Sequence, residues 1–204
     1  MKRDTAQRVR RAIQSRPRGK PFASVEFLGL GTRPAVDHAL SRFARNGFIT
    51  RLAHGLYVRP RVSPYIGTVT PLPEAILEAV ARKTGERIQV SGAKAAAELG
   101  LTTQHPLVTP FETTGPSRRL MAGGREIALG HASLRRMTLA GRPAALGLAA
   151  LWHLGRKRVS AATLARIEEA LAPAEFKALV RVMPVQPQWL AAAFRSYQEA
   201  RSHA

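Results

Sequence analysis

Residues 32–61 read TRPAVDHALSRFARNGFITRLAHGLYVRPR, and this stretch decides how the fold is interpreted. Val36, Leu40 and Phe43 recur at intervals of three and four residues, which predicts an amphipathic helix. Thr32 is a favourable N-cap, and the proline two residues later lacks an N–H that the first helical turn would leave unpaired anyway. We therefore expect a helix that begins after Thr32, buries one face and exposes the other.

The second half of the stretch predicts a short β-hairpin. Asn46-Gly47 tolerates the left-handed backbone conformation that ends many helices. Residues 48–52 and 56–59 are β-prone, and the three residues between them end in a glycine. A helix with a polar, arginine-bearing face followed by a basic hairpin is the outline of a winged helix-turn-helix, whose recognition helix enters the major groove of DNA.

The residues before this stretch supply the remaining elements of such a domain. Residues 5–15 read as a supporting helix, residues 22–23 as a short strand, and residues 25–28 as a short helix capped by Ser24. We therefore expect residues 1–62 to form a winged helix-turn-helix DNA-binding domain.

The outward face of the helix and the hairpin give the candidate DNA contacts. The early turns of a recognition helix reach deepest, so Arg33, His38 and Ser41 are expected at base edges. Later helix residues are expected at phosphates, and hairpin residues at the backbone or minor groove. The full DNA-binding set is Thr32, Arg33, Asp37, His38, Ser41, Arg42, Arg45, Arg51, His54, Arg59 and Arg61, with Arg8, Arg11, Arg16, Arg18 and Lys20 as clamps on flanking phosphates. The alternative for the helix residues is an ordinary solvated face.

The charge balance favours a polyanionic partner. The 204 residues contain 32 Lys and Arg against 13 Asp and Glu, a formal net charge of +19. Residues 1–61 hold 14 of the basic and 3 of the acidic residues, so positive charge is densest where the helix and hairpin are expected. Neutralisation of phosphates supplies most non-specific affinity for nucleic acid. The alternative is a basic surface that contacts only water.

The composition also argues against several kinds of chemistry. The absence of cysteine excludes disulfides and cysteine-ligated zinc, and the charged N-terminus lacks the apolar run of a signal peptide. No apolar stretch is long enough to cross a bilayer, so we expect a soluble, cytoplasmic protein. Asp occurs only twice and the six histidines are scattered, so no catalytic site, metal or cofactor is expected. A nuclease built on Glu112 and Glu126 beside Lys94 is kept as a third hypothesis.

The rest of the chain is expected to form a second domain. Prolines and glycines predict a linker over residues 63–69. Residues 70–204 are expected to be α+β, with a small antiparallel sheet followed by a helical bundle, so that the whole chain is α+β. This region carries a possible secondary basic surface, which comprises Arg118, Arg119, Arg135, Arg136, Arg156, Lys157 and Arg158.

Three segments resemble the AbiEi-type antitoxins of type IV toxin–antitoxin systems, which act in phage defence. They are ALSRFARNGFITRLAHGLYVRP (39–60), ERIQVSGAKAAAELGLTTQHPLVTPFETTGPSRRL (86–120) and ALWHLG (150–155). The resemblance implies a winged helix that binds inverted repeats in its own promoter, as a monomer or dimer on double-stranded DNA, and represses its operon. It also implies a C-terminal region that counters a nucleotidyltransferase toxin without requiring a stable complex. The alternative is a stand-alone transcriptional regulator whose C-terminal domain senses a signal or oligomerises.

Overall fold

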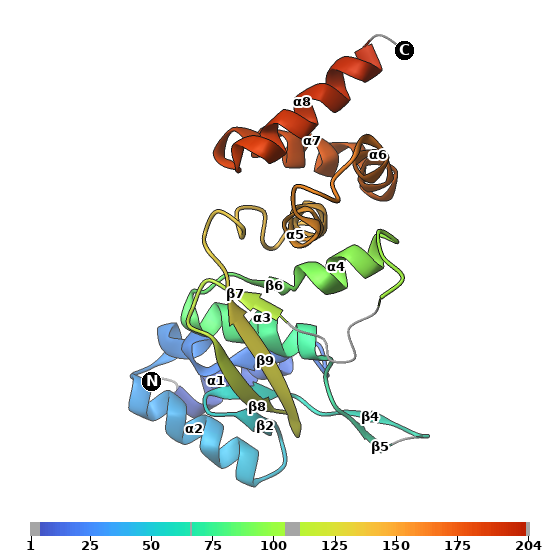
Figure 1. The fold of residues 1–204 in the computed structure, drawn as a ribbon. Coiled ribbons are helices and arrows are strands. Elements are labelled where there is room, and N and C mark those ends of the chain that lie inside the picture. Colours follow the sequence, from blue (N-terminus) through green and yellow to red (C-terminus); the bar gives the residue numbers. More distant parts are fainter. Residues whose placement is uncertain (1–4, 66, 105–110, 203–204) are drawn as a thin grey trace. The chain divides into compact units, whose positions relative to one another are not determined.

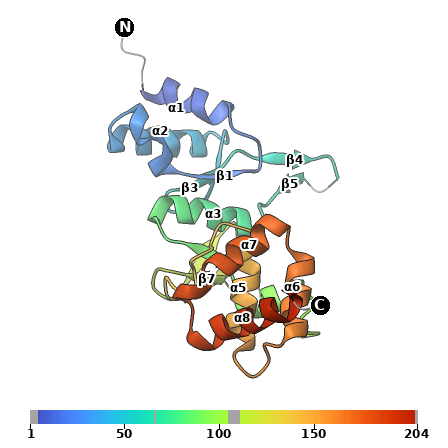
Figure 2. The ribbon, with the colours of Figure 1, turned by 90° about the horizontal axis from the view of Figure 1, so that it is seen from above.

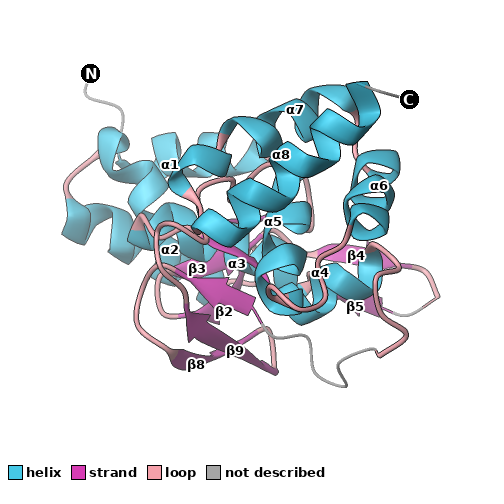
Figure 3. Ribbon diagram, turned by 45° about the horizontal axis from the view of Figure 1, so that its top comes forward, coloured by secondary structure: helices cyan, strands magenta, loops and turns pink. Residues whose placement is uncertain are grey.

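The computed structural model describes residues 5–65, 67–104 and 111–202. Helices and small sheets alternate along the chain, which confirms the predicted α+β class (Figures 1 and 3). The chain divides into two compact units. The first comprises residues 1–86 and 120–127, and the second comprises residues 87–119 and 128–204.

Among the described residues, the first unit contains four helical elements, five short strands and parts of two further strands at residues 120–122 and 125–127. Strands β1, β2 and β3 form an antiparallel sheet in the order β1-β3-β2, and β4 pairs with β5 in a separate hairpin. The elements are α1 (Thr5–Gln14), β1 (Pro21–Ala23), the 3₁₀ helix η1 (Ser24–Leu30), α2 (Arg33–Arg45), β2 (Thr50–Ala53), β3 (Leu56–Val58), β4 (Arg61–Ser63), β5 (Gly67–Val69) and α3 (Pro73–Thr84).

Helix α2 forms as its periodicity predicts. The side chains of Val36, Leu40 and Phe43 are buried in a core with residues of α1, β1 and η1. Gly47 adopts a left-handed conformation with φ +71°, which ends the helix as expected. Thr32 occupies the N-cap position, but its side chain accepts no capping hydrogen bond.

The short helix predicted over residues 25–28 forms as a 3₁₀ helix over residues 24–30, and Ala23 occupies the N-cap position that the sequence analysis gave to Ser24. The backbone N–H of Ser24 donates to the carbonyl of Gly55 at 2.9 Å, which ties this residue to the sheet. Ala23 therefore precedes the helix, and its N–H donates to the carboxylate of Glu26 at 2.7 Å. Gly29 and Gly31 then disfavour any extension into a longer α-helix.

The linker predicted over residues 63–69 is wrong, because Ser63 lies in strand β4 and residues 67–69 form strand β5, which pairs with it. Val62 and Val69 are β-branched and suit strands, while Gly67 adopts φ +70° at the turn. Helix α3, which we had expected in the second domain, belongs to the first compact unit and packs against β1. The first unit therefore extends well beyond residue 62.

The second unit contains most of the helices. Its elements are β6 (Ile88–Val90), α4 (Gly92–Glu98), β7 (Phe111–Thr113), α5 (Ala144–Leu154), α6 (Ala161–Ala170), α7 (Pro173–Arg181), the 3₁₀ helix η2 (Met183–Val185) and α8 (Gln188–Ser202). It also contains residues 118–119 of β8 (Arg118–Ala122) and residues 128–131 of β9 (Arg125–His131). The sequence also predicts a strand over residues 107–113, whose first four residues lie outside the described residues. Ser91 and Ser160 accept capping hydrogen bonds at the starts of α4 and α6, as α-helical N-caps do.

The sheet of this region is mixed, so the prediction of an antiparallel sheet is wrong. The strand order is β6-β7-β9-β8, and β7 pairs with β9 in parallel, with Phe111 opposite Leu129. The Ser117 hydroxyl accepts from the His131 N–H at 2.8 Å, which fixes the connection after β7 to the end of β9. Strand β8 therefore lies at the sheet edge, and β9 returns between it and β7.

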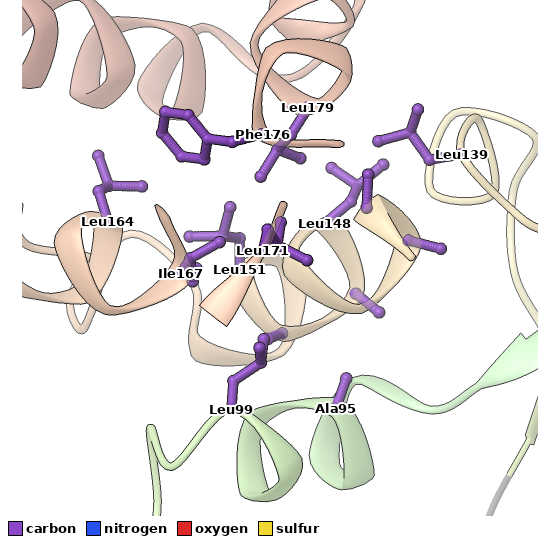
Figure 4. Close-up of a cluster of buried hydrophobic side chains, with 14 of the residues drawn as sticks. Ala95, Leu99, Leu139, Leu148, Leu151, Leu164, Ile167, Leu171, Phe176 and Leu179 are labelled. Carbon is purple, nitrogen blue, oxygen red and sulfur yellow. The ribbon is translucent and has the colours of Figure 1, made fainter. Parts of the chain in front are cut away.

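Helix α5 is the centre of the second core. Leu148 and Leu151 are fully buried beneath side chains from α6 and α7, including Ile167 and Leu179 (Figure 4). Helix α4 packs closely on the other side of α5, because a Cβ added at Gly92 would lie only 2.4 Å from the carbonyl oxygen of Ala149. No helix among the described residues combines the length and apolar character required to cross a bilayer.

Candidate nucleic-acid interface

The outer face of α2 presents polar and cationic side chains. Arg33, His38, Ser41, Arg42 and Arg45 are all exposed, while the apolar residues between them are buried. The carboxylate of Asp37 lies 3.7 Å from the Nε atom of Arg33, one helical turn away. This pair is exposed, so it holds Arg33 only weakly.

A groove of about 390 Å³ runs between the start of α1 and the outer face of α2. Its α2 wall carries the side chains of His38, Arg42 and Arg45, and its α1 wall is formed by Thr5 and Ala6. The groove thus gathers three of the predicted DNA contacts in one concave site. A concave, cationic site suits a phosphate group, because charge-assisted hydrogen bonds are strongest where several donors converge.

The β2–β3 hairpin is shorter and more constrained than a projecting wing. The Arg51 guanidinium lies 3.2 Å from the Nδ1 atom of His54, and both residues are exposed. Helices α3 and η1 hold the tip of the hairpin in place. The Lys83 ammonium donates to the His54 carbonyl at 2.6 Å, and the Ser24 N–H donates to the Gly55 carbonyl. Arg51 and His54 can therefore contact a ligand that lies against the surface of the unit, but the short hairpin does not project them away from it.

Two of the predicted contacts in the first unit have structural partners instead. The Arg59 guanidinium donates to the carbonyl of Gln14 at 2.9 Å, where α1 ends and leaves carbonyls unpaired. Arg16 pairs with Glu26 at 2.7 Å and is also half-buried. By contrast Arg18, Lys20 and Arg61 are exposed. Arg59 and Arg16 therefore have structural roles within the unit, and their contact with DNA stays a prediction.

Glu26 is the centre of an ion-pair cluster that the sequence analysis missed. Its carboxylate accepts from Arg16 at 2.7 Å, from Arg82 at 3.2 Å and from the Ala23 N–H. Burial alone would raise the pKa of Glu26, but these hydrogen bonds and the Arg16 charge outweigh it and lower the pKa below its usual value. Because Arg82 also donates to the Pro21 carbonyl at 2.9 Å, the cluster joins α3 to η1 and β1.

Replacing Glu26 with alanine is expected to cost about 2 kcal/mol of unfolding free energy, because two arginines lose their partner in a partly buried site. Glu78→Ala is the matched control: it removes an exposed partner 3.9 Å from the same Arg82 and should cost less than about 0.5 kcal/mol. Urea unfolding followed by far-ultraviolet circular dichroism measures both. Equal losses in the two variants would contradict the role assigned to Glu26.

The same cluster predicts a pH dependence of stability. A lowered pKa means that the folded state favours the carboxylate, so the stabilisation is complete above the usual pKa of 4.5 and is lost as pH falls through the lowered value. The Glu26→Gln variant should therefore lose less stability than the unmodified chain on acidification from pH 6 to pH 3. Trp152 and Trp189 both lie in the second unit. Tryptophan fluorescence therefore follows the unfolding of that unit and serves as an internal comparison for the first.

A protein-family model matches residues 8–179, which include elements of both units. The chain belongs to the Family of unknown function DUF6088. Searches of curated proteins and of solved structures gave no significant match.

In this DUF6088 chain, several members of the expected secondary basic surface have partners within the second unit. Arg136 donates to Glu112 at 2.7 Å and lies over the ring of Trp152. The remaining bonds go to carbonyl groups: Arg118 donates to Pro116, Arg135 to Val185, and Arg158 to Leu154 and His153. Arg119, Arg135, Arg156, Lys157 and Arg158 are exposed. The secondary basic surface therefore stays a prediction, with Arg136 the member most firmly held within the unit.

The two carboxylates considered for a nuclease belong to different compact units. Glu112 lies in the second unit and accepts from Arg136 and from the Gln89 amide at 3.3 Å, whereas Glu126 belongs to the first unit. Within residues 5–65, 67–104 and 111–202, no group of three or more His, Asp or Glu side chains could hold a metal ion. The candidate site is therefore the cationic surface of the first unit.

Proposed function

We propose that the first unit is a winged helix-turn-helix that binds double-stranded DNA, with α2 as the recognition helix in the major groove. The observation that carries this proposal is the outer face of α2, where Arg33, His38, Ser41, Arg42 and Arg45 are exposed above a buried apolar stripe. The succession helix, strand, short helix, helix and hairpin, with the sheet order β1-β3-β2, supports the same interpretation.

The charge along the chain supports DNA as the partner. No acidic residue occurs from position 38 to position 73, whereas this stretch contains five arginines. It covers most of α2 and both hairpins of the first unit. A cationic surface attracts polyanions, and its attraction to the DNA phosphate backbone is strongest at low ionic strength.

The groove between α1 and α2 suggests how contacts are divided. His38, Arg42 and Arg45 converge there, so we assign them to a backbone phosphate. Arg33 and Ser41 lie outside the groove and are assigned to base edges, since phosphate contacts position a protein and base contacts specify sequence. This moves His38 from the base-reading set to the phosphate-binding set.

We further propose that the protein is a non-enzymatic antitoxin that represses its own operon and counters a nucleotidyltransferase toxin. The resemblance of residues 39–60, 86–120 and 150–155 to AbiEi-type antitoxins supports this role. The alternative role is a stand-alone regulator. Co-expression of the adjacent open reading frame with the full chain separates them, because an antitoxin restores growth and a stand-alone regulator does not.

DNA binding is tested by selection from a random duplex library, with the region upstream of the gene as a second probe. We expect selection of an inverted repeat, whose half-sites are separated by whole helical turns if two copies bind. Contact with about five phosphates should give a slope near −4.5 in a plot of log K against log salt concentration. A flat salt response together with no selected sequence would overturn the proposal.

A further inference from the structure

Most residues of the β4–β5 hairpin are exposed, while Ser63 and Val69 are partly buried. Val62 on β4 is 65% exposed and Tyr65 at the tip is 93% exposed. Figures 1 and 2 both show the hairpin extending beyond the other strands of this unit. An isolated two-stranded hairpin is at best marginally stable in water, so one that carries exposed apolar side chains is suited to lie against a partner.

The root of the hairpin is basic. The Gly19 N–H donates to the Arg59 carbonyl at 2.8 Å, and the Arg18 guanidinium lies 3.5 Å from the Pro60 carbonyl. Gly19 also packs against the side chain of Arg61, so the basic turn before β1 lies directly beside β4. Arg18, Lys20 and Arg61 therefore form an exposed cationic base from which the hairpin extends.

The hairpin begins close to the segment that follows α2. Thr50 and Arg51, the first residues of β2, line one cavity with Pro60 and with Thr68 of β5. Thr50 is five residues beyond the end of α2, so the hairpin root and the C-terminal end of the recognition helix are connected through one short segment. A duplex bound by α2 would continue past this root.

We propose that β4–β5 is a second DNA-binding element, which grips the duplex flanking the stretch that α2 reads; this inference rests on the proposed function of α2. A two-stranded ribbon fits a DNA groove, and the side chains of Arg61, Ser63, Tyr65 and Thr68 all carry hydrogen-bond donors. About four residues at ~3.3 Å each give a reach of about 13 Å, which corresponds to about four base pairs of axis length.

Charge favours DNA over a second copy of the chain as the occupant. Residues 59–70 contain two arginines and no acidic residue, and the adjoining turn adds three more basic residues at positions 16–20. A second copy would bring a further net charge of +19 to the contact. Like charges facing one another oppose association, whereas the phosphates of a duplex complement them.

The test uses the full chain and the double variant Arg61→Ser/Tyr65→Ser, whose two exposed side chains are not part of the core. Arg181→Ser/Val185→Ser, which alters one exposed arginine and one exposed apolar residue of the second unit, is the matched control. Affinity is measured for the selected duplex with full flanks and with flanks trimmed by four base pairs. Hydroxyl-radical footprints are recorded on the full-length duplex.

We expect trimming to weaken binding of the unmodified chain and of the control about tenfold, and of the hairpin variant less than twofold. The variant's footprint should be shorter by about three to four base pairs, its salt slope lower by about 1, and its selected core sequence unchanged.

Full flank dependence and an unchanged footprint in the variant would overturn the hairpin assignment while leaving the proposed function intact. Loss of self-association, seen by sedimentation with the footprint unchanged, would overturn it in favour of a protein contact. Failure of the unmodified chain to bind any duplex would overturn both proposals.

Discussion

The double variant Arg42→Ala/Arg45→Ala is expected to bind its selected duplex about 100-fold more weakly than the unmodified chain at moderate salt. Both side chains line the groove between α1 and α2, where we assign a backbone phosphate. A hydrogen bond to a charged group contributes about 1.5–3 kcal/mol, so losing two reduces affinity by at least two orders of magnitude. Fluorescence anisotropy titrations over a range of salt concentrations measure this, and the slope should fall by about 1, because both arginines are assigned to one phosphate.

The loss should be similar for every duplex sequence, because phosphate contacts carry no sequence information. Both arginines are exposed on α2, so the free energy of unfolding, measured by thermal denaturation, should change by less than about 0.5 kcal/mol. The variant Arg156→Ala/Lys157→Ala removes two exposed charges from the second unit and serves as the control for net charge. A loss of less than threefold, or an equal loss in the control, would contradict the placement of DNA on α2.

The largest expected effect on stability comes from Gly92, the first residue of α4. A methyl group at this position would lie 2.4 Å from the carbonyl oxygen of Ala149 and 2.6 Å from Cβ of His153, so α4 and α5 would have to move apart. We expect Gly92→Ala to cost about 3 kcal/mol, at the upper end of overpacking effects. Urea unfolding monitored by far-ultraviolet circular dichroism, to which the helices of both units contribute, measures this change.

Gly29 provides the matched control for this substitution. An added Cβ there meets no atom within 4 Å and its φ is not in the left-handed region, so Gly29→Ala should alter stability by less than about 0.5 kcal/mol. If Gly92→Ala were as mild as the control, α4 and α5 would not be packed as closely as described.

Local patterns predicted most of the secondary structure. Helix α2 follows from the spacing of Val36, Leu40 and Phe43, and the exposed cationic face follows from the residues between them. The caps at Ser91 and Ser160 are equally local, since an N-cap depends on its own residue and the next three. Each of these features is decided within a few positions of the chain.

Contacts between distant positions account for what the sequence could not predict. Arg59 was assigned to DNA because it is basic, but its partner carbonyl at Gln14 lies 45 positions earlier. The Glu26–Arg82 pair spans 56 positions. The parallel pairing of β7 with β9 was missed because strands adjacent in sequence were assumed to be neighbours in the sheet. The β4–β5 hairpin was missed because its proline and glycine are equally typical of a linker.

The turn between β8 and β9 returns to the first unit, where the Gly123 N–H donates to the Leu52 carbonyl at 3.2 Å. This unit is therefore discontinuous in sequence. A truncated polypeptide that stops at residue 62 would lack α3, and one that stops at residue 86 would still lack this turn, so neither would contain the whole folding unit. Deletion mapping would then report misfolding as lost activity, and genetic dissection of this protein requires point substitutions in the intact chain.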